Sequence, residues 1–195
     1  MKIECWAIGK SHETYVAEGV KDFTQRIGNY FPLEWRIFNL KKNAGSISQQ
    51  KLKQEESDLI IAALKPDDWL VSLDENGKSL SSRGLAEFIQ DRGNERVKKL
   101  IFLIGGAYGL DERLLKKSKF VWSLSMLTFP HQLVRLILAE QISRACPIGR
   151  KRTCCRGARA DNAAPRSTRE KSSRHLALSQ SRLPPVRLSR GVLRR

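Results

Sequence analysis

Residues 99–110 read KLIFLIGGAYGL, an apolar run that leads directly into a loop with three glycines. After its lysine the run is continuously apolar as far as Ile104, which is typical of a strand covered on both faces. Strands of that kind occupy the middle of parallel sheets. The stretch therefore predicts a central parallel strand over 99–104, followed at once by a tight turn.

Strand and helix patterns alternate along the chain on both sides of this stretch. Short apolar runs predict strands, and apolar residues at helical spacing predict amphipathic helices. The expected strands are 3–8, 33–40, 69–73, 99–104 and 120–124, and the expected helices are 15–27, 48–64, 82–94, 111–117 and 130–145. Residues 74–78 are expected to form a turn. This alternation predicts an α/β fold, a parallel sheet with helices on both faces, which binds ligands at the carboxyl ends of its strands.

The positive charge of the chain is concentrated at one end. The 195 residues have a formal net charge of +16, of which residues 1–145 carry only +4 and residues 146–195 carry +12. The latter segment has twelve arginines, four of the seven prolines and no Phe, Trp or Tyr. Such a composition buries too little apolar surface to offset the entropy of ordering. We therefore expect one domain over 1–145 and a disordered basic tail over 146–195.

The tail has three interpretations. It is an arginine-rich arm that binds nucleic acid, a solvated linker without function, or an abnormal C-terminus such as an out-of-frame translation. Natural basic arms usually mix Lys with Arg, whereas this tail has two lysines beside its twelve arginines. We therefore favour the second and third interpretations.

Several classes of protein are excluded by the same inspection. No apolar stretch approaches the about 20 residues that span a bilayer. The start MKIECW also lacks the pattern of a signal peptide, so we expect a cytoplasmic protein without a membrane segment. The cysteines Cys5, Cys146, Cys154 and Cys155 show neither a paired zinc-ligand spacing nor a secreted disulfide framework. We expect free thiols and no metal site.

The glycine loop 105–110 is the first candidate site. Gly105, Gly106 and Gly109 permit a sharp turn and a close approach of the backbone to a ligand, with N–H groups free for an adenosine or a carboxylate. The spacing matches neither the dinucleotide fingerprint nor the phosphate-binding loop. Two alternatives stay open: a turn that serves packing alone, and a nucleotide-binding transferase that uses the loop for phosphate.

The second candidate site is SLSMLTFPHQ, residues 123–132, followed by Arg135. A strand ends here in short polar residues, and Pro130 sets the backbone for the start of a helix. His131 and Arg135 are four residues apart and so project from one helix face near its positive end, which suits an RNA phosphate or a base edge. In the alternative interpretation His131 caps the helix and Arg135 makes a surface ion pair.

Four motifs in one order carry a resemblance to a known family. The most specific is LTFPHQ at 127–132, with Arg135 and Glu140-Gln141 after it. The others are Ile8-Gly9-Lys10, Leu73 with Gly77-Lys78, and Ile104-Gly105-Gly106 with Gly109-Leu110. Together they closely resemble the large-subunit rRNA methyltransferase H family over residues 1–145. This family belongs to the SPOUT methyltransferases, whose α/β fold carries a C-terminal trefoil knot.

The resemblance implies a cofactor, a substrate and partners. It implies S-adenosyl-L-methionine bound in the knot, methyl transfer to N3 of a pseudouridine in 23S rRNA of the ribosome, and a homodimer in which the partner subunit completes each site. No metal is needed. His131 and Arg135 are then the candidates for binding the target nucleotide or steering its proton. The cofactor contacts that it implies are Leu73, Gly105, Leu124, Ser125, Met126, Leu127, Thr128 and Phe129.

The chain departs from the family pattern at its C-terminal end. Ser143 stands where the family has an aromatic residue, and Cys146 and Pro147 are expected to break the last helix. The Gly then Tyr-His ending of the family is absent, so the sequence predicts better retention of cofactor binding than of catalysis. The alternative function is a non-catalytic RNA-binding protein that acts through its basic tail.

Overall fold

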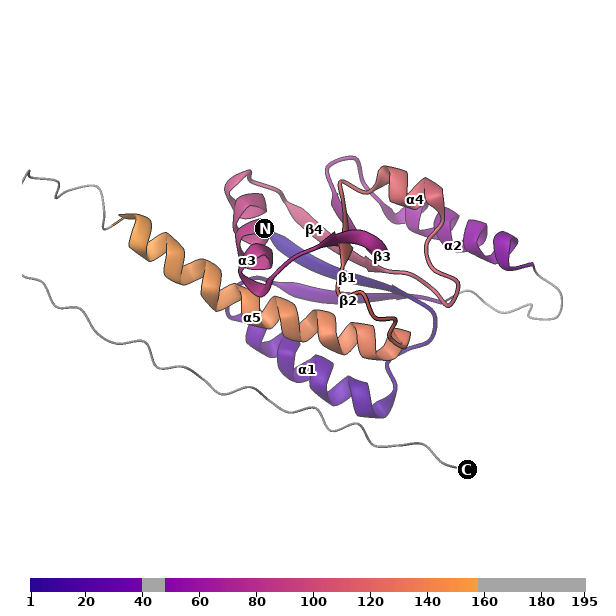
Figure 1. The fold of residues 1–195 in the computed structure, drawn as a ribbon, viewed down its shortest axis with the longest axis horizontal. Coiled ribbons are helices and arrows are strands. Elements are labelled where there is room, and N and C mark those ends of the chain that lie inside the picture. The colour runs from indigo at the N-terminus through magenta and orange to yellow at the C-terminus, as the bar shows by residue number, and fades with distance from the viewer. Residues whose placement is uncertain (40–47, 158–195) are drawn as a thin grey trace, which may run out of the picture. The chain divides into compact units, whose positions relative to one another are not determined.

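The computed structural model describes residues 1–39 and 48–157. Within these ranges the strands are β1 (Lys2–Ile8), β2 (Leu33–Phe38), β3 (Trp69–Ser79), β4 (Lys99–Ile104) and β5 (Phe120–Ser123). The helices are α1 (Thr14–Gly28), α2 (Gln49–Ala63), α3 (Ser82–Asn94), α4 (Glu112–Lys117) and α5 (His131–Gly157) (Figure 1). The predicted strand end at Leu40, and residues 158–195 of the predicted tail, lie outside the described residues.

The strands form one parallel sheet in the order β2-β1-β4-β3-β5. β4 lies in the middle, paired with β1 on one side and β3 on the other, and both pairs are parallel. The continuous apolar run explains this central position, because a strand without polar side chains is stable only where both of its faces are covered and both of its edges are paired. The prediction of a central parallel strand is confirmed.

Helices cover both faces of this sheet (Figure 1). Alternate β4 residues point to opposite sides: Phe102 joins a core cluster with α1, α3 and α5, and Leu103 joins a second cluster with α2 and α4. Both side chains are fully buried. The predicted α/β fold, a parallel sheet between two helix layers, is therefore confirmed.

β3 is longer than the sequence predicts. The strand was expected to end at Leu73, with a turn over 74–78, but β3 continues to Ser79. Leu73 and Lys78 both lie opposite Trp122 of β5, so the chain makes a short detour and then resumes the same pairing. The expectation of a simple turn was wrong because pairing with β5, a tertiary contact, carries the strand past its polar residues.

α5 also continues beyond the predicted break. The helix was expected to end at Ala145, yet it runs through Pro147 to Gly157. Proline has no N–H to donate to the carbonyl one turn back, which weakens the helix at this point. Cys146 is only 5% exposed, and Ile148 packs against the core cluster that contains residues of α3 and α5. The stabilisation from this packing outweighs the loss of one backbone hydrogen bond. Residues 146–157 are therefore helix, and the disorder expected for them was wrong.

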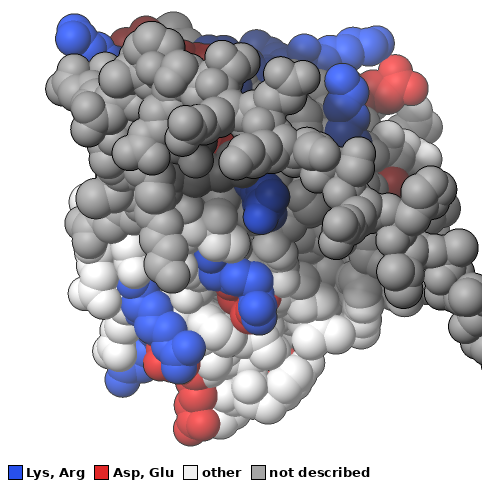
Figure 2. Space-filling view, turned by 60° about the vertical axis from the view of Figure 1, so that its left-hand side comes forward, with Lys and Arg blue, Asp and Glu red and all other residues white. Residues whose placement is uncertain are grey.

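The surface of the described residues mixes both signs of charge. Figure 2 shows one face on which Lys and Arg side chains lie beside Asp and Glu side chains. Ion pairs between exposed side chains of the described residues include Lys116 with Glu112 and Arg26 with Asp22. No helix in the described part of the chain is long and apolar enough to cross a membrane.

Candidate functional site

A cavity of about 780 Å³ opens at the carboxyl ends of β3, β4 and β5. This is the edge at which a parallel sheet is expected to bind ligands. Three segments supply most of its wall. They are the detour of β3 between Leu73 and Lys78, the glycine loop 105–110 after β4, and the loop 124–130 between β5 and α5. The lining residues include Leu73, Gly105, Leu124, Ser125, Leu127, Thr128, Phe129 and His131. The topology thus brings together residues that are up to 81 positions apart in the sequence, from Lys53 to Val134.

The glycine loop, which lines this cavity, folds back on itself. The N–H of Gly109 donates to the carbonyl of Gly106 at 3.1 Å, and Gly109 has a φ of +79°, which side chains rarely tolerate. A Cβ on Gly105 would lie 3.0 Å from Leu110 Cγ. The loop therefore needs glycine for its shape, and it lines the cavity both with its glycines, which present only backbone, and with Ala107, Tyr108 and Leu110.

Gly77 brings β3 and β5 close together next to Asn76, which lines the cavity. A Cβ at this position would lie 2.7 Å from the backbone carbon of Trp122 and 2.8 Å from the nitrogen of Ser123. Backbone at that distance cannot move aside without separating the strands. Gly77 is therefore required where the β3 detour rejoins β5.

A buried carboxylate of α2 supports the glycine loop from behind. The Glu56 side chain lies where a Cβ on Gly106 would meet its oxygens at 2.6 and 2.7 Å. Glu56 is 9% exposed, and burial raises the pKa of its carboxyl group, although Lys53 opposes the shift. Lys53 itself lines the cavity. Helix α2 thus contributes a wall and a positive charge to the site.

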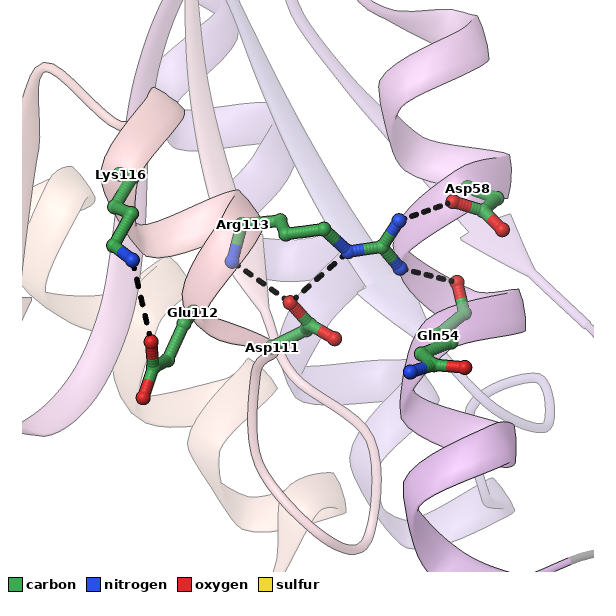
Figure 3. A network of polar contacts seen from close by, with 6 residues as sticks. All are labelled: Gln54, Asp58, Asp111, Glu112, Arg113 and Lys116. Atoms are coloured by element: carbon green, nitrogen blue, oxygen red, sulfur yellow. Dashed lines mark hydrogen bonds and ion pairs between the residues drawn. The ribbon is translucent and has the colours of Figure 1, made fainter.

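An arginine network ties α4 to α2 beside this wall. Figure 3 shows the guanidinium of Arg113 between the two helices. Its Nη1 donates to Asp58 at 3.0 Å, its Nη2 to the carbonyl of Gln54 at 3.3 Å, and its Nε to Asp111 at 3.3 Å. Asp111 also caps α4 by accepting from the N–H of Arg113. Because the glycine loop leads directly into α4, the network fixes the end of that loop.

The loop between β5 and α5 is held by short polar side chains. Ser123 Oγ donates to the carbonyl of Ser125 at 2.9 Å, and the N–H of Leu127 donates to Ser125 Oγ at 3.0 Å. Met126, at the tip, is 96% exposed and is not among the residues that line the cavity. The other residues predicted for cofactor contact in this loop, Leu124 to Phe129, all line it.

His131, the first residue of α5, lines the same cavity. Its imidazole is half-buried and makes no hydrogen bond within the described residues, which disfavours the alternative that it caps the helix. Burial and the nearby positive charge of Arg135 lower the pKa of His131 below its ordinary value of 6.5. At neutral pH the ring is therefore uncharged and able to accept a proton.

Arg135 lies one helical turn further on but does not line the cavity. It is 1% exposed, and its Nη1 donates to the carbonyl of Lys10 at 2.8 Å while its Nη2 donates to that of Ile8 at 3.4 Å. No carboxylate pairs with it in the part of the chain that the structure describes. The alternative of a surface ion pair was therefore wrong.

The sequence did not single out two neighbours of the site. Glu56 and Lys53 belong to α2, far from any motif, and no local pattern marks a carboxylate that will pack on a glycine. Gln132 was noticed only as part of the LTFPHQ motif, yet it bonds to the chain after β1. No group of three or more His, Cys, Asp or Glu side chains able to hold a metal occurs among the described residues.

Comparison with known proteins assigns the chain. The family model described as "Predicted SPOUT methyltransferase" matches residues 1–153, which includes every segment of the cavity wall. The chain belongs to the SPOUT methyltransferase family. It is therefore a methyltransferase, as the sequence predicts.

Individual relatives are similar to this chain over about three quarters of its length, and two of them are methyltransferases by name. "Ribosomal RNA large subunit methyltransferase H" of Cytophaga hutchinsonii is 40% identical over 148 residues, which cover 76% of this chain and 95% of the relative. The protein of the same name from Carboxydothermus hydrogenoformans is 37% identical over 151 residues, again 76% and 95% of the two chains. A solved structure of a probable methylase family protein from Haemophilus influenzae is 10% identical, has a TM-score of 0.45 and covers 83% of this chain and 72% of its own.

Proposed function

We propose that this SPOUT protein methylates N3 of a pseudouridine in 23S rRNA, with S-adenosyl-L-methionine as the methyl donor. The observation that supports it best is the cavity itself. His131, whose lowered pKa leaves the imidazole uncharged at neutral pH, lines a cavity whose other residues include glycines, apolar side chains and the charged Lys53, Asp74 and Glu75. The relatives named for methylation of large-subunit rRNA supply the substrate class.

The residues of the cavity fit S-adenosyl-L-methionine. A volume of about 780 Å³ is within the range of small-molecule sites, about 300–1,000 Å³. The shape of the glycine loop, which a side chain on Gly105 would fill, leaves backbone groups for an adenosine. We propose that Leu73, Gly105 and the loop 124–129 hold the cofactor, and that this C-terminal part of the sheet forms the trefoil knot that the family resemblance implies.

The chain's own residues then have two tasks. When bound, the cofactor supplies a methyl group carried on a positively charged sulfur. The loops around the cavity exclude water and orient the base, which accounts for much of the rate of such a transfer. His131 accepts the N3 proton of the pseudouridine at a free ring nitrogen, for which its lowered pKa keeps it uncharged. No further group is required from the described residues.

The proposal also includes partners and place. We propose a homodimer in which the partner subunit completes the site, acting on the ribosome in the cytoplasm. The low net charge of residues 1–145, +4, favours recognition of ribosome shape by a few placed residues over binding through a broad basic patch of the domain. The basic residues 158–195 lie outside the described residues.

Calorimetry with S-adenosyl-L-methionine and with ATP tests the cofactor. We expect binding of the first and none of the second. Gly105→Val, whose side chain would meet Leu110 and the backbone of Gly109, should weaken the binding at least about tenfold. Gly93→Ala is the matched control, because nothing lies within 4 Å of a Cβ there. Equal binding by both variants would contradict the assignment of this cavity.

A transfer assay tests the reaction. Ribosomes that lack the modification are incubated with the protein and methyl-labelled cofactor, and the modified nucleotide is mapped by mass spectrometry. Label on N3 of a pseudouridine in 23S rRNA is the expected result. Label on another position, or RNA binding without any transfer, would reject the proposed reaction. The second of those outcomes is the one expected for a non-catalytic RNA-binding protein.

A further inference from the structure

The start of α5 is fastened to the segment that follows β1 by two side chains. Gln132 Nε2 donates to the carbonyl of Ser11 at 3.1 Å, and its Oε1 accepts from the N–H of Glu13 at 3.3 Å. Arg135 donates to the carbonyls of Ile8 and Lys10. Two side chains on one turn of helix thus hold a stretch of backbone that belongs to no strand or helix over residues 9–13.

The two side chains are also joined to each other. Arg135 Nη1 lies 3.5 Å from Gln132 Oε1 and donates to it. The guanidinium fork, with donors in fixed directions, matches carbonyls that diverge from one turn of backbone. Gly9 makes that turn possible, because its φ is +111° and a Cβ there would lie 3.9 Å from Arg135 Nη2.

Because Arg135 is buried, any of its N–H groups without a hydrogen-bond partner raises the free energy of the folded state. Arg135 is 1% exposed, and its Nε has no hydrogen-bond partner among the described residues. A buried positive charge held only by neutral carbonyls is retained at a cost in free energy, which argues for a role beyond stability. The same turn of α5 presents His131 to the cavity, so anything that fixes the turn also fixes the imidazole.

We propose that Arg135 is a positioning residue, which with Gln132 fastens the first turn of α5 to residues 8–13 and so holds His131 at the edge of the cavity. This inference depends on the proposed function only in the role that it gives to His131. It assigns Arg135 no contact with the substrate, in place of the direct role that the sequence suggested. The β1 end of the sheet thereby becomes part of the active site without lining it.

Arg135 also acts on His131 through its charge. The guanidinium contributes, after burial, to the lowered pKa of His131, and it does the same for His12, whose ring packs edge-on against Trp35. The other charged side chains that line the cavity are Lys53 of α2 and Asp74 and Glu75 of β3. Replacing Arg135 therefore has an electrostatic effect that loss of packing alone would not produce.

Two substitutions of Arg135 distinguish its hydrogen bonds to the backbone from its positive charge. Arg135→Lys keeps the charge and loses the fork, whereas Arg135→Met keeps the apolar stem and loses both. We expect both variants to lower kcat about 10- to 100-fold with little change in KM for the RNA or the cofactor, because the imidazole is displaced. Only Arg135→Met should move the pH profile of kcat upward, toward 6.5. Arg144→Ala, an exposed residue of the same helix paired with Glu140, is the control and should change neither.

An activity-independent measurement keeps the inference separate from the proposed reaction. NMR titration of His131 in the purified protein should show a higher pKa in Arg135→Met than in the unsubstituted chain, and hydrogen exchange should quicken at residues 9–13 in both variants. Gln132→Ala, which removes three of the bonds but no buried charge, serves if the Arg135 variants do not fold. Unchanged titration and exchange would overturn the inference. A large rise in KM for the RNA at unchanged kcat would also overturn it, because it would mean that Arg135 contacts the substrate.

Discussion

The two ends of the parallel sheet treat their charges in opposite ways. At the amino end, Glu4 accepts from Trp6 Nε1 at 2.8 Å and pairs with Lys2 at 3.3 Å and Lys99 at 3.4 Å. Lys99 pairs in addition with Asp68 at 3.7 Å. Every buried charge of that end has a partner of opposite sign.

At the carboxyl end, Arg135, His131 and His12 have no such partner among the described residues. Arg135 is held by carbonyls, and His131 has no hydrogen bond in the described chain. His12 Nδ1 is buried and likewise has no partner among the described residues. The amino end is built for stability, whereas the carboxyl end leaves these polar groups without opposite charges and presents one of them, His131, to the cavity, at a cost that the rest of the fold offsets.

The largest effect is expected for a substitution at the carboxyl end, at His131. His131→Asn removes the proton acceptor at the cavity edge while keeping a polar side chain of similar shape. We expect kcat for methyl transfer to fall about 10²- to 10⁴-fold, with the midpoint of thermal unfolding almost unchanged. Single-turnover assays and calorimetric unfolding measure the two. A fall in stability without a fall in kcat would mean that the two ends do not divide these roles.

The corresponding change at the amino end is Glu4→Gln. It leaves Lys2 and Lys99 without their shared carboxylate and weakens the bond from Trp6, so the free energy of unfolding should fall by about 1.5–3 kcal/mol. Urea unfolding measures the loss. Affinity for S-adenosyl-L-methionine should stay as it was, because the cavity lies at the other end, and a weakened affinity would count against the contrast.

Gly77→Ala sharpens the contrast within the carboxyl end. An added Cβ would press on the backbone of Val121 to Ser123 at 2.7 to 2.8 Å, so overpacking should cost about 1–3 kcal/mol and loosen the cavity wall. Urea unfolding and cofactor calorimetry should both register the change. Gly28→Ala, with open space around the new methyl group, is the matched control and should leave both unchanged or raise stability slightly.

The smallest expected effect is on the pH dependence of stability, which should differ between the two ends of the sheet. Burial and Arg135 lower the pKa of His12 and His131 below 6.5 in the folded protein, so the unfolded chain takes up protons first as the pH falls below 6.5. Stability is therefore lost from pH 6.5 downward until the folded histidines are also protonated. Substituting both histidines by Asn should flatten this part of the unfolding curve.

The amino end should titrate in a lower window. Burial raises the pKa of Glu4, but its bonds to Trp6, Lys2 and Lys99 outweigh burial, and the net pKa is lowered from 4.5. The stability that Glu4 contributes is present above pH 4.5 and is lost as the pH falls through the lowered value. Glu4→Gln should remove the loss in this window alone. An effect of the same size above pH 5 would show that the two ends are coupled.

The sequence predicted what is local and missed what is tertiary. β4 was predicted because five consecutive apolar residues admit few other structures, and the glycine loop because its residues allow little else. The continuation of β3 to Ser79 was missed, since it depends on pairing with β5, which no local pattern records. The last helix was predicted to end at Ala145, before Pro147, because the burial of Cys146 that keeps it intact is not visible in the sequence.

The same division holds for the candidate site. The motif around His131 and the spacing to Arg135 were visible, but spacing on a helix says only that two side chains share a face. It does not say that one faces a cavity and the other the end of β1. Glu56 was missed because its contact with Gly106 joins two segments fifty residues apart.

The detour of β3 makes the sheet tolerant of length changes at one point. Since Leu73 and Lys78 share the partner Trp122, residues between them set no register, and extra residues next to Glu75 would leave every strand pair in place. Both Glu75 and Asn76 are exposed, and both border the cavity. A grafted peptide or fluorescent label at this tip would report on occupancy, and natural insertions there would offer a route by which the site acquires new substrates.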